Sequence, residues 1–395
     1  MALVDMRDML RHAHENNYAV GAFDLVSLDF LEAVIDAAEQ GRAGVILSVA
    51  EPHFAHYDFE LMLPAVEAAA RRASVPVAIQ LDHGRSLDAA VRAIRLGCNS
   101  VMFDASDLDL PDNIEATRQV VEMAHGCGIP VVGELGYVAG REGEGAAFHP
   151  GEPTLTIPSE AKVYVERTEV DCLAVSIGTV QGRLKGRAKL DFTRLRQIHQ
   201  TVGVPLEIHG GSGLNEEQYR KLTALGVAKI NYYTALADIA ANVMRQQSKE
   251  APRGSFTDLK KGVKDAIGDE VLRCVRLWGS AGRAAEVLAQ CAPWEPVEHI
   301  VMLRPSRDPQ QSHCLLDRYR NDLLKIPGVR DVSIGHALDG ETPFQSLLRI
   351  QLAHPDCMQQ LKGNSSYREF CRRYCNGIDA QAAVGTFSAQ QPRNP

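Results

Sequence analysis

The chain has 395 residues, 45% of them hydrophobic and 23% charged, which is ordinary for a soluble globular protein and long enough for two domains. A net charge of -8 and a pI near 5.9 argue against a nucleic-acid partner. No apolar stretch approaches the roughly 18 residues of a membrane span, and the acidic, amphipathic N-terminus is unlike a signal peptide. Because the nine cysteines form no CxxC pair, we expect reduced thiols and a cytoplasmic protein.

Short apolar runs alternate with amphipathic helical segments up to about residue 240. Several of the helical segments end at a glycine, as helices commonly do. Eight such units predict a parallel (β/α)₈ barrel, a TIM barrel, although an open doubly wound sheet is the alternative. The predicted strands are 18–23, 44–49, 75–81, 100–103, 130–133, 172–176, 204–208 and 228–230.

The pattern changes after AQCAPWEPVEH, whose prolines and tryptophan indicate a boundary. From there the predicted order is β-α-β-β-α-β, which is that of a small ferredoxin-like α+β domain. We therefore expect a barrel over 1–285, a linker over 286–297, the second domain over 298–388 and a disordered tail over 389–395.

Nearly every predicted strand of the barrel ends on a polar residue. A polar loop residue means little by itself, but closure of a barrel brings all the C-terminal strand ends to one mouth, where barrel enzymes keep their chemistry. The residues are Asp24, Ser48 or Glu51, Asp82, Asp104, Glu134, His209 and Asn231.

Two histidines and an aspartate stand out among these strand ends. His83 and His209 follow different apolar runs, and Asp82 precedes His83 directly. Imidazoles brought together beside a carboxylate indicate a divalent metal with an acid/base partner. Taken singly, each histidine could instead be a hydrogen-bonded mouth residue, and Asp82 could instead cap the following helix.

Small residues after the seventh predicted strand indicate a phosphate site. HGGSGLNEE exposes backbone N–H groups at the start of a helix, and KINYYTAL follows the eighth strand. Loops after strands seven and eight of this fold commonly bind phosphate. The candidate residues are Gly210, Gly211, Ser212, Asn231 and Thr234.

Two further segments carry charged residues beside glycines. Lys185, in QGRLKG, could supply a countercharge to the phosphate or simply face water. The segment ELGYVAGREGEG, which includes Glu142, has the composition of a lid that closes over substrate. A solvated surface loop is the simpler interpretation of the same residues.

Residues up to about 283 resemble the class II ketose-bisphosphate aldolases, in the fructose- and tagatose-bisphosphate branch. The motifs YAVGAFD, LDHG, SVMFDAS, GELG, LAVSIGT, HGGSGL and KINYYTAL occur in the family's order. The resemblance implies a (β/α)₈ barrel, a divalent metal for which Zn²⁺ is the first candidate, and it allows a monovalent cation besides. It also implies reversible aldol cleavage of a phosphorylated ketose to dihydroxyacetone phosphate, through an enediolate.

The resemblance assigns roles to individual residues. Asp82 would be the acid/base at the aldehyde oxygen, and Glu142 would abstract the proton that creates the enediolate. His83 and His209 would be metal ligands, and Asp104 and Glu134 match positions used in alternative metal placements. The phosphate would be held by Gly182, Gly211, Ser212, Asn231 and Thr234.

The chain departs from the family at three positions of the predicted mouth. Gln181 stands where GT-x-H-G has the third histidine ligand, Asp24 replaces an asparagine that faces substrate, and Ala50 replaces a serine. Asp24 could compensate for the lost histidine by retuning the metal or the substrate. Alternatively, the barrel could be a non-catalytic phosphosugar-binding or assembly protein. A third interpretation is a related enediolate lyase or isomerase of specialised metabolism.

Residues 298–388 resemble the stress-responsive dimeric α/β-barrel (Dabb) domain through HIVMLRP, the IPGV turn and SSYREF. That resemblance implies either pairing of two copies through their sheets or a small pocket that acts on the aldolase product. We expect a homo-oligomer, either a dimer or larger. His299 and Tyr367 are the candidate polar groups of this domain, with packing or surface roles as the alternative.

Overall fold

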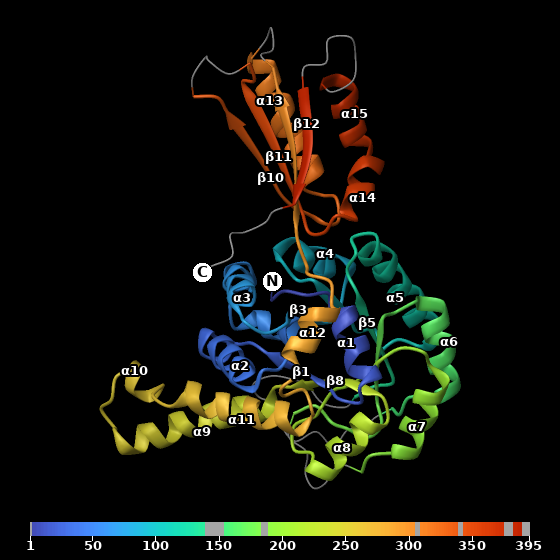
Figure 1. Ribbon diagram of the computed structural model, residues 1–395, viewed down its shortest axis with the longest axis vertical. Helices are drawn as coiled ribbons and strands as arrows, with labels where there is room; N and C mark the ends of the chain where they lie inside the picture. The colour runs from blue at the N-terminus through green and yellow to red at the C-terminus, as the bar shows by residue number, and fades with distance from the viewer. Residues whose placement is uncertain are drawn as a thin grey trace. The chain divides into compact units, whose positions relative to one another are not determined.

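The computed structural model describes residues 2–138, 154–182, 189–304, 309–338, 343–374 and 382–388 (Figure 1). The chain divides into two compact units. The first comprises Met1–Ala90, Cys98–Val121 and Pro130–Pro293, and the second comprises Val91–Gly97, Glu122–Ile129 and Trp294–Pro395. Glu142 of the expected lid, the expected countercharge Lys185 and the expected disordered tail 389–395 lie outside the described residues.

Eight parallel strands form a closed barrel in the first unit. Each strand pairs with the next along the chain, and β8 returns to pair with β1, so the expected TIM barrel is confirmed and the open sheet is excluded. Every strand residue is buried, as expected for strands covered on both faces. The strands are β1 (Val20–Asp24), β2 (Val45–Ala50), β3 (Val77–Gly84), β4 (Ser100–Phe103), β5 (Val131–Leu135), β6 (Cys172–Val175), β7 (Leu206–Ile208) and β8 (Val227–Tyr232).

Helices alternate with these strands, and several begin at local capping signals. Asp58 accepts hydrogen bonds from the first turn of α3, and Asn215 and Gln218 form a reciprocal capping box at α8. No helix in the described part of the chain is long and apolar enough to cross a membrane. The helices are α1 (Met6–Glu15), α2 (Leu28–Gly41), the 3₁₀ helix η1 (Glu51–Ala55), α3 (Phe59–Arg72), α4 (Leu87–Leu96), α5 (Leu110–His125), α6 (Pro158–Thr168), α7 (Phe192–Thr201), α8 (Glu216–Ala224), α9 (Thr234–Glu250), α10 (Phe256–Leu259), α11 (Val263–Leu277) and α12 (Ala284–Gln290).

Helix α1 closes the N-terminal end of the barrel. Its buried side chains Met6, Met9 and Leu10 belong to one apolar cluster with inward-facing strand residues such as Ile46 and Met102. Burial of this apolar surface stabilises the barrel and seals that end against water. The opposite end of the barrel, where the polar strand-end residues lie, is therefore the one that can hold a site.

The second unit contains an antiparallel four-stranded sheet of order β10-β11-β9-β12. The chain order β-α-β-β-α-β and this strand order are those of the expected ferredoxin-like domain. The predicted second helix is interrupted at Asn364, whose side chain accepts hydrogen bonds from the N–H groups of Ser366 and Tyr367 and so caps a new helix. The elements are β9 (Val297–Leu303), α13 (Pro309–Leu323), β10 (Val329–His336), β11 (Ser346–Leu352), α14 (Cys357–Gly363), α15 (Ser365–Tyr374) and β12 (Ala382–Ser388).

Candidate active site and metal centre

The end of β3 carries two adjacent site residues because the strand is distorted there. The register with β4 shifts between Leu81 and Gly84, and His83 has a left-handed φ of 48°. A regular strand would point Asp82 and His83 to opposite faces, and the distortion removes that alternation. The carboxylate and the imidazole consequently lie close together, with His83 Nε2 4.0 Å from Asp82 Oδ2.

His83 is held by a side chain on each ring nitrogen. Its Nδ1 lies 3.1 Å from Oδ2 of Asp104, and its Nε2 lies 3.0 Å from the amide nitrogen of Gln181. In this arrangement a neutral imidazole donates from Nδ1 to the carboxylate and keeps its lone pair at Nε2. Gln181 therefore occupies the place beside Nε2 where a further ligand to a shared metal would stand.

The second histidine comes to the same place from the far side of the barrel. His209 follows β7, is fully buried, and its ring centroid lies 4.5 Å from that of His83. Ligand atoms of Asp82, His83 and His209 all lie within 4.8 Å of one another, and so do those of His83, Asp104 and Glu134. The structure thus brings together the two histidines and the three carboxylates that the sequence predicts at the mouth.

The carboxyl groups of Asp104 and Glu134 have pKa values displaced in opposite directions. Burial, reinforced by the charge of Asp104, raises the pKa of Glu134 to about 8. Asp104 is buried too, but hydrogen bonds from His83 and Ser106 outweigh burial and hold its pKa well below its usual value. Strongly displaced neighbouring carboxyl groups are typical of functional sites.

This donor set fits a divalent cation. Imidazole nitrogens suit zinc and its transition-metal neighbours, and carboxylate oxygens can complete either a tetrahedral or a larger coordination shell. Within the described residues, Oε2 of Glu134 receives no hydrogen bond although it is buried. A cation bound by Glu134 would satisfy that oxygen, whereas an empty apolar interior would leave it uncompensated.

Two buried charged residues of the site have no counterpart in the sequence predictions. Glu207 in β7 and Lys229 in β8 are both fully buried and form an ion pair of 2.7 Å. Burial alone would neutralise both groups, but the charge of Lys229 holds the Glu207 pKa low, and Glu207 raises the pKa of Lys229. The available signal was a charged residue inside each of two apolar strand runs. A protonated Lys229 cannot serve as a Schiff-base nucleophile.

Asn231, which the sequence predicts as a phosphate residue, lies against Asp82. Its side-chain amide donates to both carboxylate oxygens, at 3.1 and 3.0 Å. Asn231 in turn accepts a hydrogen bond of 2.6 Å from Lys229. The orientation of the Asp82 carboxylate is thus fixed by hydrogen bonds from β8.

The loops after β6 and β7 meet at the predicted phosphate site. Gly210 has a φ of 66°, and a side chain there would lie 2.4 Å from the carbonyl oxygen of Val180, so only glycine permits this approach. Ser212 accepts a hydrogen bond from the N–H of Ala235 in the first turn of α9, which begins at Thr234. Backbone N–H groups at such a helix start can bind an anion.

The other two departures from the family that the sequence resembles, Asp24 and Ala50, lie at the ends of β1 and β2. Asp24 is fully buried and pairs in register with Ser48, while Ala50 pairs with Asp82. Burial, together with the negative charge of Asp24, raises the pKa of Tyr57. Asp24 therefore places a carboxyl group at the end of β1, where the resemblance leads us to expect an asparagine.

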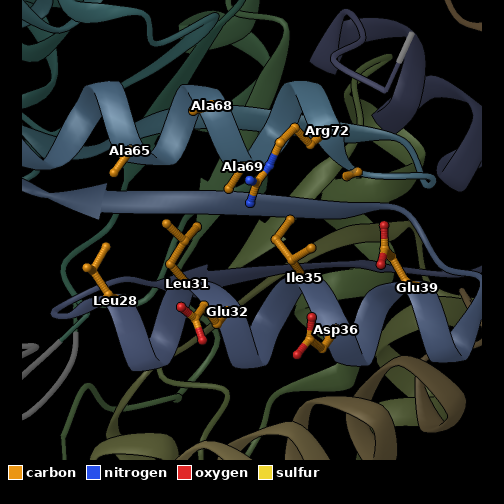
Figure 2. A pocket seen from close by; sticks show the side chains of 11 residues that line it. Leu28, Leu31, Glu32, Ile35, Asp36, Glu39, Ala65, Ala68, Ala69 and Arg72 are labelled. Atoms are coloured by element: carbon orange, nitrogen blue, oxygen red, sulfur yellow. The ribbon is translucent and has the colours of Figure 1, made fainter. Parts of the chain in front are cut away.

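A separate groove lies on the outside of the barrel, between α2 and α3 (Figure 2). It has a volume of about 460 Å³, and Leu31 and Ile35 on α2 face Ala65 and Ala69 on α3 across it. It contains none of the site residues described above. The groove is a surface feature between two helices and contributes nothing to the chemistry of the mouth.

Compared with known protein families, residues 4–283 match the family described as fructose-bisphosphate aldolase class-II. The fructose-bisphosphate aldolase of Geobacillus stearothermophilus is 37% identical over 296 residues, which cover 72% of this chain and 100% of the relative. The crystal structure of the YdjI aldolase from Escherichia coli K12 is 33% identical with a TM-score of 0.63, covering 71% of this chain and 99% of that one. A putative fructose-1,6-biphosphate aldolase from Coccidioides immitis is 29% identical with a TM-score of 0.65, covering 70% and 97%. The family match includes all eight strands of the barrel and ends before β9.

Proposed function

Because the chain belongs to the class II fructose-bisphosphate aldolase family, we propose that it cleaves a phosphorylated ketose whose aldehyde half differs from that of fructose bisphosphate. The family makes the chain an aldolase, a lyase that breaks and forms a carbon–carbon bond. The observation that carries the proposal is the convergence of Asp82, His83 and His209 at one barrel mouth. The changed aldehyde half is supported by Asp24, which puts a buried carboxyl group at the end of β1 where the family resemblance leads us to expect an asparagine.

We propose that His83 and His209 hold a divalent metal, with zinc as the first candidate. Gln181 would be a weaker third ligand than the histidine of the family, because a side-chain amide is a poorer donor to zinc than an imidazole nitrogen. Asp104 and Glu134 offer an oxygen-rich alternative around His83. When bound, the metal supplies a Lewis acid, which lowers the free energy of a carbanion next to a carbonyl group.

Residues of the chain carry out the proton transfers and bind the phosphate. Asp82, oriented by Asn231, takes the proton from the hydroxyl group on the carbon that becomes the aldehyde when the carbon–carbon bond breaks. Backbone N–H groups around Ser212 and the start of α9 bind the phosphate and so position the substrate beside Asp82. Glu142, which lies outside the described residues, is proposed from the family resemblance to remove the proton that creates the enediolate.

The activity can be tested with purified full-length protein and a panel of ketose 1-phosphates and 1,6-bisphosphates. Formation of dihydroxyacetone phosphate from one member is the expected result. Asp82→Asn keeps the size of the side chain but cannot take up a proton, so the rate should fall by about 10²- to 10⁴-fold. Retention of the rate in this variant would remove Asp82 from the proposed mechanism.

We propose that the C-terminal unit is a Dabb-like module that pairs two copies of the chain. Along β9, buried residues alternate with partly exposed ones. On the exposed side of the sheet, Met302 of β9 is 38% exposed and Phe387 of the neighbouring β12 is 55% exposed. A sheet face that exposes large apolar side chains beside the Glu298–Arg349 ion pair supports pairing with the same face of a second copy. Light scattering should show a dimer or larger oligomer that Met302→Lys weakens. Leu61→Lys, on an exposed residue of α3, should leave the oligomer unchanged.

We propose a cytoplasmic location for the enzyme. Buried thiols such as those of Cys172, Cys274 and Cys291 support a reducing compartment, because they form no disulfide within the described residues. Fractionation of cells that express the protein would test this location.

A further inference from the structure

An ion pair lies in the interior of this barrel, where bulky apolar side chains ordinarily form the packed layers. Glu207 and Lys229 are neighbours in register on β7 and β8, and neither has any exposed surface. Removing two charges from water is unfavourable, and apolar residues of similar volume are often equally stable or more stable at such positions. The stability of the fold therefore does not explain why an ion pair occupies these two positions. We look for the explanation in the contacts that the pair makes.

The Glu207–Lys229 pair contacts His209 directly and is connected to Asp82 through Asn231. Oε1 of Glu207 lies 2.7 Å from Nε2 of His209 and 2.7 Å from Nζ of Lys229. The same Nζ donates to Asn231, and Asn231 donates to Asp82. A continuous series of polar contacts thus runs through the barrel interior from the metal-binding histidine to the acid/base carboxylate.

We infer that Glu207 is a positioning residue, whose carboxylate fixes the ring of His209 so that Nδ1 faces the metal position. The inference rests on the proposed function, since it concerns the orientation of a metal ligand. A histidine that binds metal through one nitrogen is commonly held at the other by a carboxylate, which sets the ring orientation and strengthens the metal-facing nitrogen as a donor. Lys229 provides the countercharge that keeps this carboxylate ionic in the interior.

This role of Glu207 also bears on Gln181, the weakest proposed ligand of the metal. Gln181 offers a neutral amide where the family has an imidazole, so the remaining nitrogen ligands have to bind the metal more strongly. A carboxylate 2.7 Å from Nε2 increases the donor strength of His209 in this way. Glu207 and Gln181 are thus linked through the metal that His83 and His209 share.

The test compares metal affinities of full-length variants, measured by competition of Zn²⁺ with a chromophoric chelator. Glu207→Gln keeps the shape of the side chain and removes its charge, and should weaken zinc binding about 10- to 100-fold. Glu207→Leu with Lys229→Met replaces both buried charges by apolar side chains and should remain folded, yet show the same loss. The visible absorption of bound Co²⁺ should change in both variants, because the geometry at the metal changes.

Asp171→Asn is the matched control. Asp171 pairs with Arg7 and accepts from the N–H of Val131 at the other end of the barrel, so its loss should lower the thermal midpoint without altering metal affinity. Unchanged affinity and an unchanged Co²⁺ spectrum in the folded Glu207 variants would overturn the inference and leave the proposed function intact. A parent protein that binds no metal would instead overturn the metal-dependent function on which the inference depends.

Discussion

Gln181→His restores the imidazole that the family has at this position, and it tests whether the position faces the metal. The terminal nitrogen of glutamine and Nε2 of histidine are the same number of bonds from Cα, so the new ring can reach the place where Gln181 contacts His83 at 3.0 Å. Structural zinc sites contribute about 10–16 kcal/mol, or about 3 kcal/mol for each of four ligands. Because the amide or a water already supplies a weak donor, we expect a gain of about 1.4–2.8 kcal/mol, which is about 10- to 100-fold in affinity.

The assay is chelator competition with Zn²⁺ on the full-length protein, together with the thermal midpoint of the metal-free form. Gln181→Leu is the control, because it fills the same space without a donor and should bind zinc no more tightly than the parent. The thermal midpoint of metal-free Gln181→His should stay near that of the parent, since no core packing changes. A zinc affinity within twofold of the parent would refute the placement of residue 181 beside the metal.

Two further predictions concern local backbone geometry and acid stability. Gly210→Ala puts a Cβ 2.4 Å from the Val180 carbonyl oxygen at a left-handed φ, so it should lower the free energy of unfolding by more than the about 1–2 kcal/mol of φ strain alone. Gly213→Ala has the same kind of φ and no atom within 4 Å, so the difference between the two variants in chemical denaturation isolates the contact, and equal losses would contradict it. His299, buried between Tyr367 and Thr386, has its pKa lowered to about 4 by burial and by the charge of Lys362. The folded C-terminal unit therefore keeps its full stability above pH 6.5, where His299 is neutral in both the folded and unfolded states. As the pH falls from 6.5 to 4, its free energy of unfolding should drop by up to about 3 kcal/mol. Hydrogen exchange of the β9 amides should accelerate over that interval and should do so less in His299→Gln; an identical acceleration in the variant would contradict this origin.

The sequence predicted the barrel well because its strands are short and mostly apolar, and such runs can be recognised without tertiary information. The polar strand ends were readable for the same reason, since each interrupts an apolar run. The break at Asn364 was missed because a helical pattern continues on both sides of it, and only the capping hydrogen bonds reveal the interruption.

The connections within the site were harder to predict, because they depend on the register between neighbouring strands and on which side chains meet across the barrel. Nothing in the order of residues places Asn231 against Asp82, or Glu207 against Lys229. The left-handed conformation of His83, which lets two adjacent residues serve one site, is likewise a product of the β3–β4 register. A charged residue inside an apolar strand run was the one local signal of the buried pair.

The central claim is that a metal held at the barrel mouth enables the chain to remove a proton next to a carbonyl group. The most direct measurement is the exchange of deuterium from solvent into dihydroxyacetone phosphate, followed by NMR with protein stripped of metal and then titrated with Zn²⁺, Mn²⁺ or Co²⁺. The account predicts that exchange stops on removal of metal and returns when one of these ions is restored. Exchange that persists in the stripped protein, or that no divalent ion restores, would contradict it.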